Sequence, residues 1–459
     1  MSDSQLEFLN LLREALPMPA QIEDRREVLL ENSRDFGQLV GESILPLAVV
    51  YPQTVADVQI IMRLANEHGM PVISRGAGTG VSGAAHVTGQ CIVLNLMQLN
   101  RIIEIRPEDE IAVVEPGVIN YELNQAVEEY GLMYAPDPAS YKMSTVGGNI
   151  ATNAGGLRCA KYGVTRESVL GLDIVLADGR LIRVGKNTFK GVAGYDLTSL
   201  FTGSEGTLGV VVRAVLRLRY QPVDERDVSI VFPSLEAAVI GVQSIARARV
   251  QPAILELLDL PTIRILDEQY QTDYASHGGA MLLVRLDGYG AEKEEAVIRE
   301  TFSDGQTTLS SSGVEEATQL IEMRRTSRGD TKDDAYRMGE DVAVPKSLMA
   351  KYVQELRKIA TDHDVDVRVI AHAGDGNLHP TFSVEPDAGE EPLIRLSKAL
   401  EDSIRVAIDM GGTITGEHGV GLIKREWLTW EQSEDVIRIQ HAIKSLLDEK
   451  NILNPGKAI

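Results

Sequence analysis

The chain has 459 residues, 44% of them hydrophobic, and this length predicts about two to four domains with sizeable cores. A formal net charge of −22, without any Lys/Arg-rich run, argues against a nucleic-acid partner and against an anionic membrane surface. Cys91 and Cys159 are too few for a disulfide framework or an iron–sulfur site, so a reducing cytoplasm fits the composition.

The N-terminal residues 1–16 mix acids with leucines at helical spacing. They lack the basic start, apolar core and cleavage site of a secretion signal, so they predict a surface helix within an N-terminal helical segment, residues 1–45. No apolar run approaches the roughly 18 residues of a membrane span.

A strand–helix–strand unit is predicted next, with strands at 47–51 and 71–74 around a helix at 54–68. It leads into residues 75–83, Arg-Gly-Ala-Gly-Thr-Gly-Val-Ser-Gly, whose glycines let backbone N–H groups approach a phosphate. A plain tight turn is the alternative. A strand at 91–96 follows where a nicotinamide-binding motif would open a helix, so NAD is disfavoured.

Two further glycine-rich tracts, residues 144–157 and 203–209, carry few charges and favour close backbone contact. Such a tract can also be a buried crossing of main chains. Together with the first glycine loop, they suggest one long cofactor laid across several loops. Strands at 174–177, 181–184 and 210–217 indicate a mixed α+β domain.

A second domain is predicted from residue 221, where the glycine-rich character stops. It contains an Arg-rich segment at 324–328. Its predicted elements are strands at 228–231, 254–257, 281–286 and 365–370, and helices at 235–248, 293–302 and 348–362. Helical patterns after Glu426 end at Asn454-Pro-Gly-Lys and are expected to return to the first domain. The expected boundaries are 46–220 for the first domain, 221–410 for the second and 411–459 for the C-terminal segment.

Two short motifs put three of the eight histidines of the chain into glycine-rich turns, at residues 371–380 and 416–421. His372, His379 and Glu417 offer two imidazole nitrogens and a carboxylate oxygen, a set that holds a catalytic divalent ion with an open position. Neither a helix nor a strand is expected between the histidines. A turn at Gly-Asp-Gly would instead bring them together, and the alternative is that each is an ordinary structural histidine.

Seven motifs, taken in order, resemble those of the FAD-binding 2-hydroxyacid dehydrogenases of the vanillyl-alcohol oxidase superfamily. This group holds D-lactate dehydrogenase, the flavin subunit of glycolate oxidase and D-2-hydroxyglutarate dehydrogenase. The motifs lie at residues 75–83, 146–149, 153–156, 203–209, 372–379, 416–421 and 454–456. The resemblance implies an α+β fold: a PCMH-type FAD-binding domain of two subdomains, a ferredoxin-like substrate (cap) domain with an antiparallel sheet, and a C-terminal helical segment.

The resemblance also implies where FAD binds. The pyrophosphate would lie on the first glycine loop, and Asn454 would close the site from the C-terminal segment. Covalent relatives carry a histidine where this chain has Thr79, so dissociable FAD is implied. The implied cofactor-binding residues are Arg75, Gly76, Ala77, Gly78, Thr79, Gly80, Ser82, Pro138, Ser144, Thr145, Gly148, Asn149, Thr152, Gly155, Gly156, Glu205, Gly206 and Asn454.

The chemistry implied is oxidation of a 2-hydroxy acid, with hydride passing to the flavin. A metal on the His/His/Glu set would chelate the substrate and lower the pKa of its hydroxyl, with zinc favoured and manganese or iron as alternatives. His418 would take the proton, since imidazole titrates close to neutral pH. Asn377 would steady the acid and Arg324 would pair its carboxylate, unless Arg324 is a solvated helix-face arginine.

The substrate is expected to be D-lactate or glycolate. The 2-hydroxyglutarate branch tends to carry a threonine and a lysine where this chain has Arg328 and Gly339, so D-2-hydroxyglutarate is the alternative substrate. A remoter alternative is the non-redox alkylglycerone-phosphate synthases, which rely on a histidine-rich run that this chain lacks. An alternative of another class is a binding protein that keeps FAD as a structural element.

Electrons must leave to an external acceptor, because no cysteine cluster is present for an iron–sulfur relay. The expected acceptors are an electron-transfer flavoprotein, a quinone, a separate iron–sulfur subunit or oxygen. The expected location is cytoplasmic, peripheral to the inner membrane where a partner recruits the protein, and a homodimer is compatible with the sequence.

Overall fold

The computed structural model describes residues 3–16, 18–37, 44–303, 308–310, 314–326, 335–385 and 390–459. The chain separates into two compact units, and neither is continuous in sequence. The first comprises Met1–Gly155, Gly163–Gln221 and Glu417–Ile459, and the second Gly156–Tyr162 and Pro222–Gly416.

The first unit opens with a four-stranded sheet in the order β1-β2-β4-β3. The predicted strand–helix–strand unit is confirmed, but its two strands are not neighbours, because β4 lies between them and is parallel to both. Thr54 starts α3 through a reciprocal capping box with Asp57. The strands are β1 (Ile22–Glu23), β2 (Ala48–Val50), β3 (Val72–Arg75) and β4 (Ile92–Asn95), and the helices beside them are α1 (Asp3–Ala15), α2 (Arg26–Glu31) and α3 (Val55–His68).

The core of this sheet is formed by α1, α3 and the buried faces of β2 to β4. The predicted N-terminal helix is confirmed as α1, which buries Phe8, Leu9 and Leu12. From the far end of the chain, Ile452 and Leu453 join the same core, and backbone bonds of 2.7 and 2.9 Å tie Val72 to Ile452 and Asn454. The C-terminal segment therefore completes the first unit.

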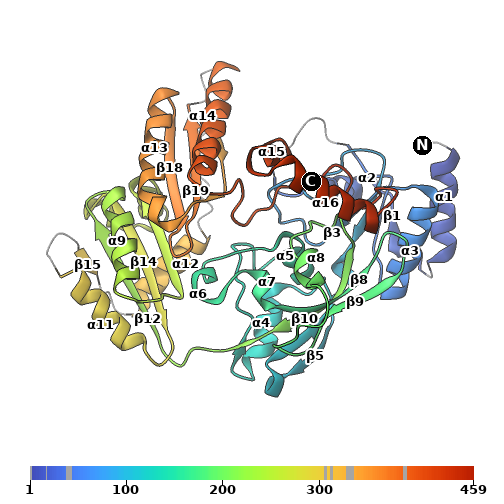
Figure 1. Cartoon of the computed structure of the whole chain (residues 1–459), viewed down its shortest axis with the longest axis horizontal. Coiled ribbons are helices and arrows are strands. Elements are labelled where there is room, and N and C mark those ends of the chain that lie inside the picture. The colour runs from blue at the N-terminus through green and yellow to red at the C-terminus, as the bar shows by residue number, and fades with distance from the viewer. Residues whose placement is uncertain are drawn as a thin grey trace. The chain divides into compact units, whose positions relative to one another are not determined.

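The second sheet of the first unit is antiparallel throughout, in the order β5-β6-β10-β8-β9 (Figure 1). Its strands are β5 (Ile102–Arg106), β6 (Ile111–Val114), β8 (Val169–Val175), β9 (Leu181–Gly185) and β10 (Val210–Arg217), and a short ribbon joins β7 (Leu132–Met133) to β11 (Arg219–Tyr220). The remaining helices of this unit are α4 (Asn120–Glu128), α5 (Val146–Thr152), α7 (Thr165–Ser168), α8 (Leu197–Phe201), α15 (Leu428–Glu431) and α16 (Glu434–Leu447).

The second unit is built on one antiparallel sheet in the order β15-β12-β14-β13-β18-β19-β16, with β17 also paired to β19. Helices α9 and α13 pack on one face, and α12 packs on the other (Figure 1). The strands are β12 (Glu225–Phe232), β13 (Ile254–Asp259), β14 (Ala280–Asp287), β15 (Thr308–Ser310), β16 (Tyr336–Gly339), β17 (Val342–Ala343), β18 (Asp366–His372) and β19 (Asn377–Val384). The helices are α6 (Cys159–Tyr162), α9 (Leu235–Arg247), α10 (Leu260–Tyr270), α11 (Ala291–Thr301), α12 (Val314–Thr326), α13 (Met349–Asp362) and α14 (Glu390–Asp409).

Helix α10 was not predicted. The strand at 281–286 was expected to follow the strand at 254–257 with no helix between them. A start signal is nevertheless present. Asp259 caps the helix by accepting a bond from Thr262 N, and Pro261 lies in the first turn.

The two cysteines differ sharply in their surroundings. Cys91 lies in a buried apolar cluster with Val49, Ile73 and Val93, and burial raises the pKa of its thiol to about 12. Cys159 is only partly buried. We therefore expect an aromatic disulfide reagent at pH 8 to modify Cys159 in the native protein and Cys91 only after unfolding. Equal rates for both thiols in the native protein would contradict this burial.

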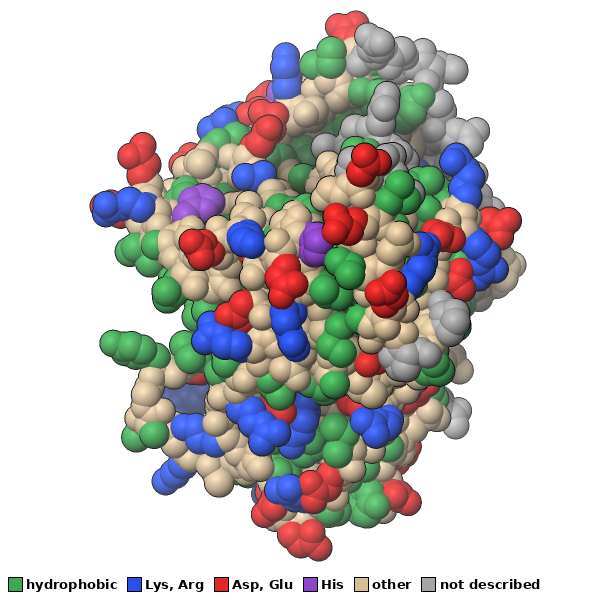
Figure 2. Space-filling view, turned by 90° about the vertical axis from the view of Figure 1, so that its right-hand side faces the viewer, with side chains coloured by type: hydrophobic (Ala, Val, Ile, Leu, Met, Phe, Trp, Pro, Cys, Tyr) green, Lys and Arg blue, Asp and Glu red, His purple; other side chains and the backbone are tan. Residues whose placement is uncertain are grey.

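The excess of acidic residues does not form one continuous surface on the face seen in Figure 2, where acidic and basic side chains are interspersed with apolar ones. Across the part of the chain that the structure describes, no helix combines the length and apolar character needed to cross a bilayer.

Candidate active site

The first glycine loop leaves the end of β3 and is held by close contacts. The Arg75 guanidinium donates to the backbone carbonyls of Arg34 and Glu31 at 2.9 and 3.3 Å. A Cβ added to Gly78, whose φ is +73°, would overlap that guanidinium, and one on Gly76 would lie 2.3 Å from Thr145 Oγ1. The glycines are thus required by close approach of the chain to Arg75 and to the second tract.

The second tract forms the short helix α5 and its N-cap. Thr145 Oγ1 accepts from Gly148 N at 3.1 Å, and Thr152 Oγ1 donates to Gly148 O at 3.2 Å. Ser144 and Asn149 are buried, with their side chains 3.5 Å apart. Among the other predicted residues nearby, Pro138 is buried and Gly155 ends the stretch that belongs to the first unit, whereas Gly156 belongs to the second unit.

The third tract is joined to β3 by the C-terminal segment. Asn454 Oδ1 accepts from Ser74 N at 3.0 Å, and Asn454 Nδ2 donates to Glu205 O at 2.6 Å. A Cβ on Gly206, whose φ is +72°, would lie 2.2 Å from Ser74 Oγ. A single amide therefore connects the third tract to the strand that leads into the first glycine loop.

The Glu205 carboxylate fixes the turn that follows the Glu-His motif. Its two oxygens accept from Val420 N and Gly421 N, both at 2.8 Å. Burial raises the pKa of Glu205 to about 7, although these two N–H groups act in the opposite direction. Nearby, burial lowers the pKa of Lys457 to about 8, and its ammonium donates to the backbone carbonyl of His86.

Glu417 lies against the second glycine tract within the first unit. A Cβ added to Gly155 would be 2.3 Å from Glu417 Oε2, so only glycine leaves room for this carboxylate. His418 has a side chain that is 35% exposed, and its Nε2 lies 3.8 Å from Glu417 Oε1. A predicted metal ligand thus borders the tract predicted to hold the flavin, and the predicted base lies beside that ligand.

In the second unit, His372 and His379 lie on neighbouring strands joined by a tight turn. The expected turn is present, but both histidines lie on strands, contrary to the expectation of no regular element. In the β18–β19 register, His372 pairs with Asn377 and Ile370 pairs with His379. Side chains of paired residues share a face, so His372, Asn377 and His379 lie on the same face. The two imidazole rings are 5.2 Å apart, centroid to centroid.

Glu256 on β13 lies directly beside His372 in the sheet register. It is fully buried; its Oε1 is 2.5 Å from His372 Nδ1 and its Oε2 is 2.9 Å from Arg324 Nε. Burial by itself raises the pKa of this carboxyl, but its interactions with His372 and Arg324 outweigh burial and lower the pKa below its ordinary value. The carboxylate therefore links a predicted metal ligand to the predicted substrate arginine.

Arg324 lies on α12 and is 8% exposed, so it is not a solvated helix-face arginine. Arg328 lies outside the described residues. Asp341, just before β17, is fully buried; its Oδ1 is 3.9 Å from His379 Nδ1 and its Oδ2 accepts from Thr415 Oγ1 at 2.8 Å. Each of the two histidines thus has an acidic neighbour in its own unit.

Asn377 packs against Gly416, the last residue of the second unit. A Cβ added to Gly416 would be 2.5 Å from Asn377 Oδ1, and among the described residues this buried oxygen has no hydrogen-bond partner. Glu417 is the next residue along the chain.

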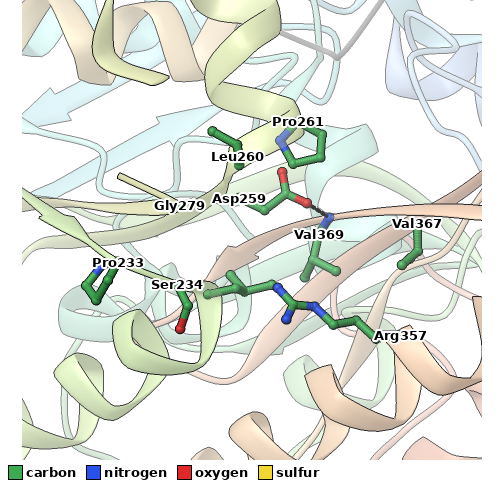
Figure 3. A pocket seen from close by; sticks show the side chains of 10 residues that line it. Pro233, Ser234, Asp259, Leu260, Pro261, Gly279, Arg357, Val367 and Val369 are labelled. Atoms are coloured by element: carbon green, nitrogen blue, oxygen red, sulfur yellow. Dashed lines mark hydrogen bonds between the residues drawn. The ribbon is translucent and has the colours of Figure 1, made fainter. Parts of the chain in front are cut away.

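A separate pocket of about 350 Å³ lies on the other face of the second unit's sheet (Figure 3). Val367 and Val369 line it and alternate along β18 with Ile370 and His372, so they point away from the histidine pair. Asp259 accepts from Val369 N at its wall. This pocket takes no part in the candidate site.

Sequence reasoning missed Glu256 and Asp341. Glu256 carries a signal, because it is one acid within the apolar run Ile254-Leu-Glu-Leu-Leu. A charge in such a run needs a buried partner. Nothing in the sequence indicates that the partner is His372, 116 residues away.

Matches to two protein-family models show which family this chain belongs to. A model described as the C-terminal domain of FAD linked oxidases matches residues 221–458, and an FAD binding domain model matches residues 46–185. The chain belongs to the FAD-linked oxidases. It is thus an oxidoreductase, and the predicted family and enzyme class are confirmed.

Individual relatives agree with this assignment. The chain is 39% identical to glycolate oxidase subunit GlcD of Bacillus subtilis, over 90% of this chain and 89% of that protein. It is 34% identical to a D-lactate dehydrogenase of Archaeoglobus fulgidus, over 90% of this chain and 91% of that protein. The crystal structure of p-cresol methylhydroxylase superposes with a TM-score of 0.81 at 17% identity, covering 100% of this chain and 97% of that one, which confirms the predicted PCMH-type fold.

The residues of this FAD-linked oxidase fit its cofactor. A Cβ at Gly76 would meet Thr145 of the second tract, one at Gly206 would meet Ser74 at the end of β3, and one at Gly78 would meet Arg75 of the same loop. Backbone groups of such tracts can approach a phosphate or a ring without side-chain interference.

Proposed function

We propose that this FAD-linked oxidase catalyses the metal-assisted oxidation of a small D-2-hydroxy acid to the 2-oxo acid, with D-lactate or glycolate favoured. The observation that carries the proposal is the His372–His379 pair on one sheet face, with the Arg324 guanidinium connected to it through Glu256. A metal-binding pair beside a carboxylate-binding group suits a substrate that carries a hydroxyl next to a carboxylate. The names of the two relatives support the same substrate class.

The metal ligands in this proposal are His372, His379 and Glu417. Gly416 packs on Asn377, and Glu417 is the next residue along the chain, which supports a carboxylate ligand beside the two imidazoles. Two imidazoles and a carboxylate suit zinc, with manganese and iron as alternatives. A divalent ion held by them would act as a Lewis acid and make the hydroxyl of the substrate more acidic.

The remaining residues bind the acid and move its proton. Arg324 would take the substrate carboxylate on its guanidinium, and Asn377 would orient the substrate through its amide. An imidazole nitrogen of His418 would accept the hydroxyl proton, while FAD, when bound, supplies the acceptor for the hydride. Glu417 adjoins the second glycine tract at Gly155, and His418 lies next to Glu417, which supports proton removal beside the flavin.

The electrons would pass to a separate acceptor, such as an electron-transfer flavoprotein, a quinone or an iron–sulfur subunit. Two cysteines in the sequence are too few to ligate an iron–sulfur cluster. The Bacillus subtilis relative is named as a subunit, which supports a partner protein. We place the enzyme in the cytoplasm, with attachment to a membrane only through that partner.

A panel of 2-hydroxy acids tests the proposal. Under anaerobic conditions, D-lactate or glycolate should bleach the flavin absorbance, L-lactate should act far more slowly than D-lactate, and chelation should abolish the reaction until metal is restored. Fastest bleaching by D-2-hydroxyglutarate would change the substrate assignment. No bleaching by any acid, before chelation or after metal is added back, would overturn the function.

A further inference from the structure

Glu256 occupies a position where a carboxylate is costly. Its neighbours along β13 belong to the apolar core, and the side chain is fully buried. A buried carboxylate destabilises a protein unless ionic or hydrogen-bonding partners compensate it. Both of its oxygens meet such partners, His372 through Oε1 and Arg324 through Oε2.

The contact with His372 determines which ring nitrogen can bind a metal. Glu256 Oε1 lies 2.5 Å from Nδ1, so this carboxylate favours the proton on Nδ1 and leaves the lone pair on Nε2. A carboxylate behind a ligating imidazole also fixes the ring orientation and strengthens the imidazole as a donor. Direct pairing of Glu256 with His372 across β13 and β18 makes this geometry part of the sheet register.

The contact with Arg324 determines how the guanidinium is presented. Glu256 Oε2 forms an ion pair with Nε at 2.9 Å, so the terminal Nη1 and Nη2 pair is the part of the fork that can meet a substrate carboxylate. A lysine in place of Arg324 could not hold Glu256 and an acid in this way, because it has a single nitrogen.

We propose that Glu256 is a positioning residue that holds both His372 for the metal and Arg324 for the substrate carboxylate. This inference rests on the proposed function and extends it, since one buried carboxylate would support two binding groups. Loss of its charge should therefore weaken metal binding and acid binding through the same substitution.

The test uses the FAD-loaded protein after metal removal, with Zn²⁺ titrated against a competing chelator. Glu256→Gln should weaken Zn²⁺ binding by about 10- to 100-fold, the usual effect of losing the carboxylate behind a ligating histidine. At saturating Zn²⁺, it should also raise the apparent Kd for D-lactate, read from flavin reduction, by about 10-fold. Glu256→Asp, which keeps the charge but shortens the reach, should fall between wild type and Glu256→Gln and serves if the Gln variant does not fold.

Asp227→Asn is the matched control. Asp227 is another buried carboxylate of the same sheet, bonded to the Arg285 guanidinium at 2.8 and 2.6 Å, so its loss imposes a similar structural cost. This variant should bind Zn²⁺ like the wild type. If both Glu256 variants bind Zn²⁺ with wild-type affinity, the proposed role of Glu256 is wrong, but the proposed function is not affected. A wild-type protein that binds no Zn²⁺ through His372 would overturn the proposed function as well.

Discussion

Replacing His418 with alanine should leave FAD bound and slow anaerobic flavin reduction by D-lactate about 10²- to 10⁴-fold, the range typical for loss of a general base. The physical reason is that the substrate hydroxyl would have to lose its proton to water. FAD content should not change, because the contacts that join the cofactor tracts come from Thr145, Glu205 and Asn454. Stopped-flow absorbance measures the rate, and the flavin spectrum after gel filtration measures the content.

His441→Ala is the control for this experiment, since His441 is an exposed histidine on α16 of the same unit. It should reduce its flavin at the wild-type rate. A His418→Ala protein that does so as well would exclude the proposed base. If the rate loss disappears as the pH is raised, water or hydroxide has replaced the imidazole, which supports the assignment.

Removing the metal should have a comparably large effect. His372→Ala should lose the bound divalent ion on purification, and flavin reduction should fall to the level of the chelated wild type, because the Lewis acid is lost. His379→Ala should behave alike. Elemental analysis gives the metal-to-FAD ratio, expected to fall from about one to near zero for a three-ligand site that loses an imidazole.

His363→Ala provides the comparison in the same unit. His363 lies at the end of α13, and its Nε2 is 2.7 Å from Asp402, so it has a surface ion-pair partner and no place among the proposed ligands. It should keep its metal and its rate. A His372→Ala protein that retains both would rule out the metal site.

Much of the fold was predictable because its signals are local. Thr54 and Asp57 mark the start of α3, and the glycine tracts were identified as places of close backbone approach. The turn after His372 was expected from Gly374 and Gly376, and the structure has it.

The parts that could not be predicted depend on pairing between strands far apart in the sequence. The insertion of β4 between β2 and β3 is one example, and the register of Glu256 against His372 is another. A sequence pattern tells which residues share a face of a strand, but not which strand lies beside it. The sequence alone therefore could not show that Glu256 lies beside His372, the proposed metal ligand.

The discontinuous units have a consequence for biosynthesis. All of the second unit has been synthesised once Gly416 emerges, and its sheet can then form. The backbone hydrogen bonds that join Val72 of β3 to Ile452 and Asn454 form later, because these two residues are translated after the whole of the second unit. The nascent first unit therefore lacks this last partner while the whole of the second unit is translated, and during that time it is exposed to chaperones and proteases.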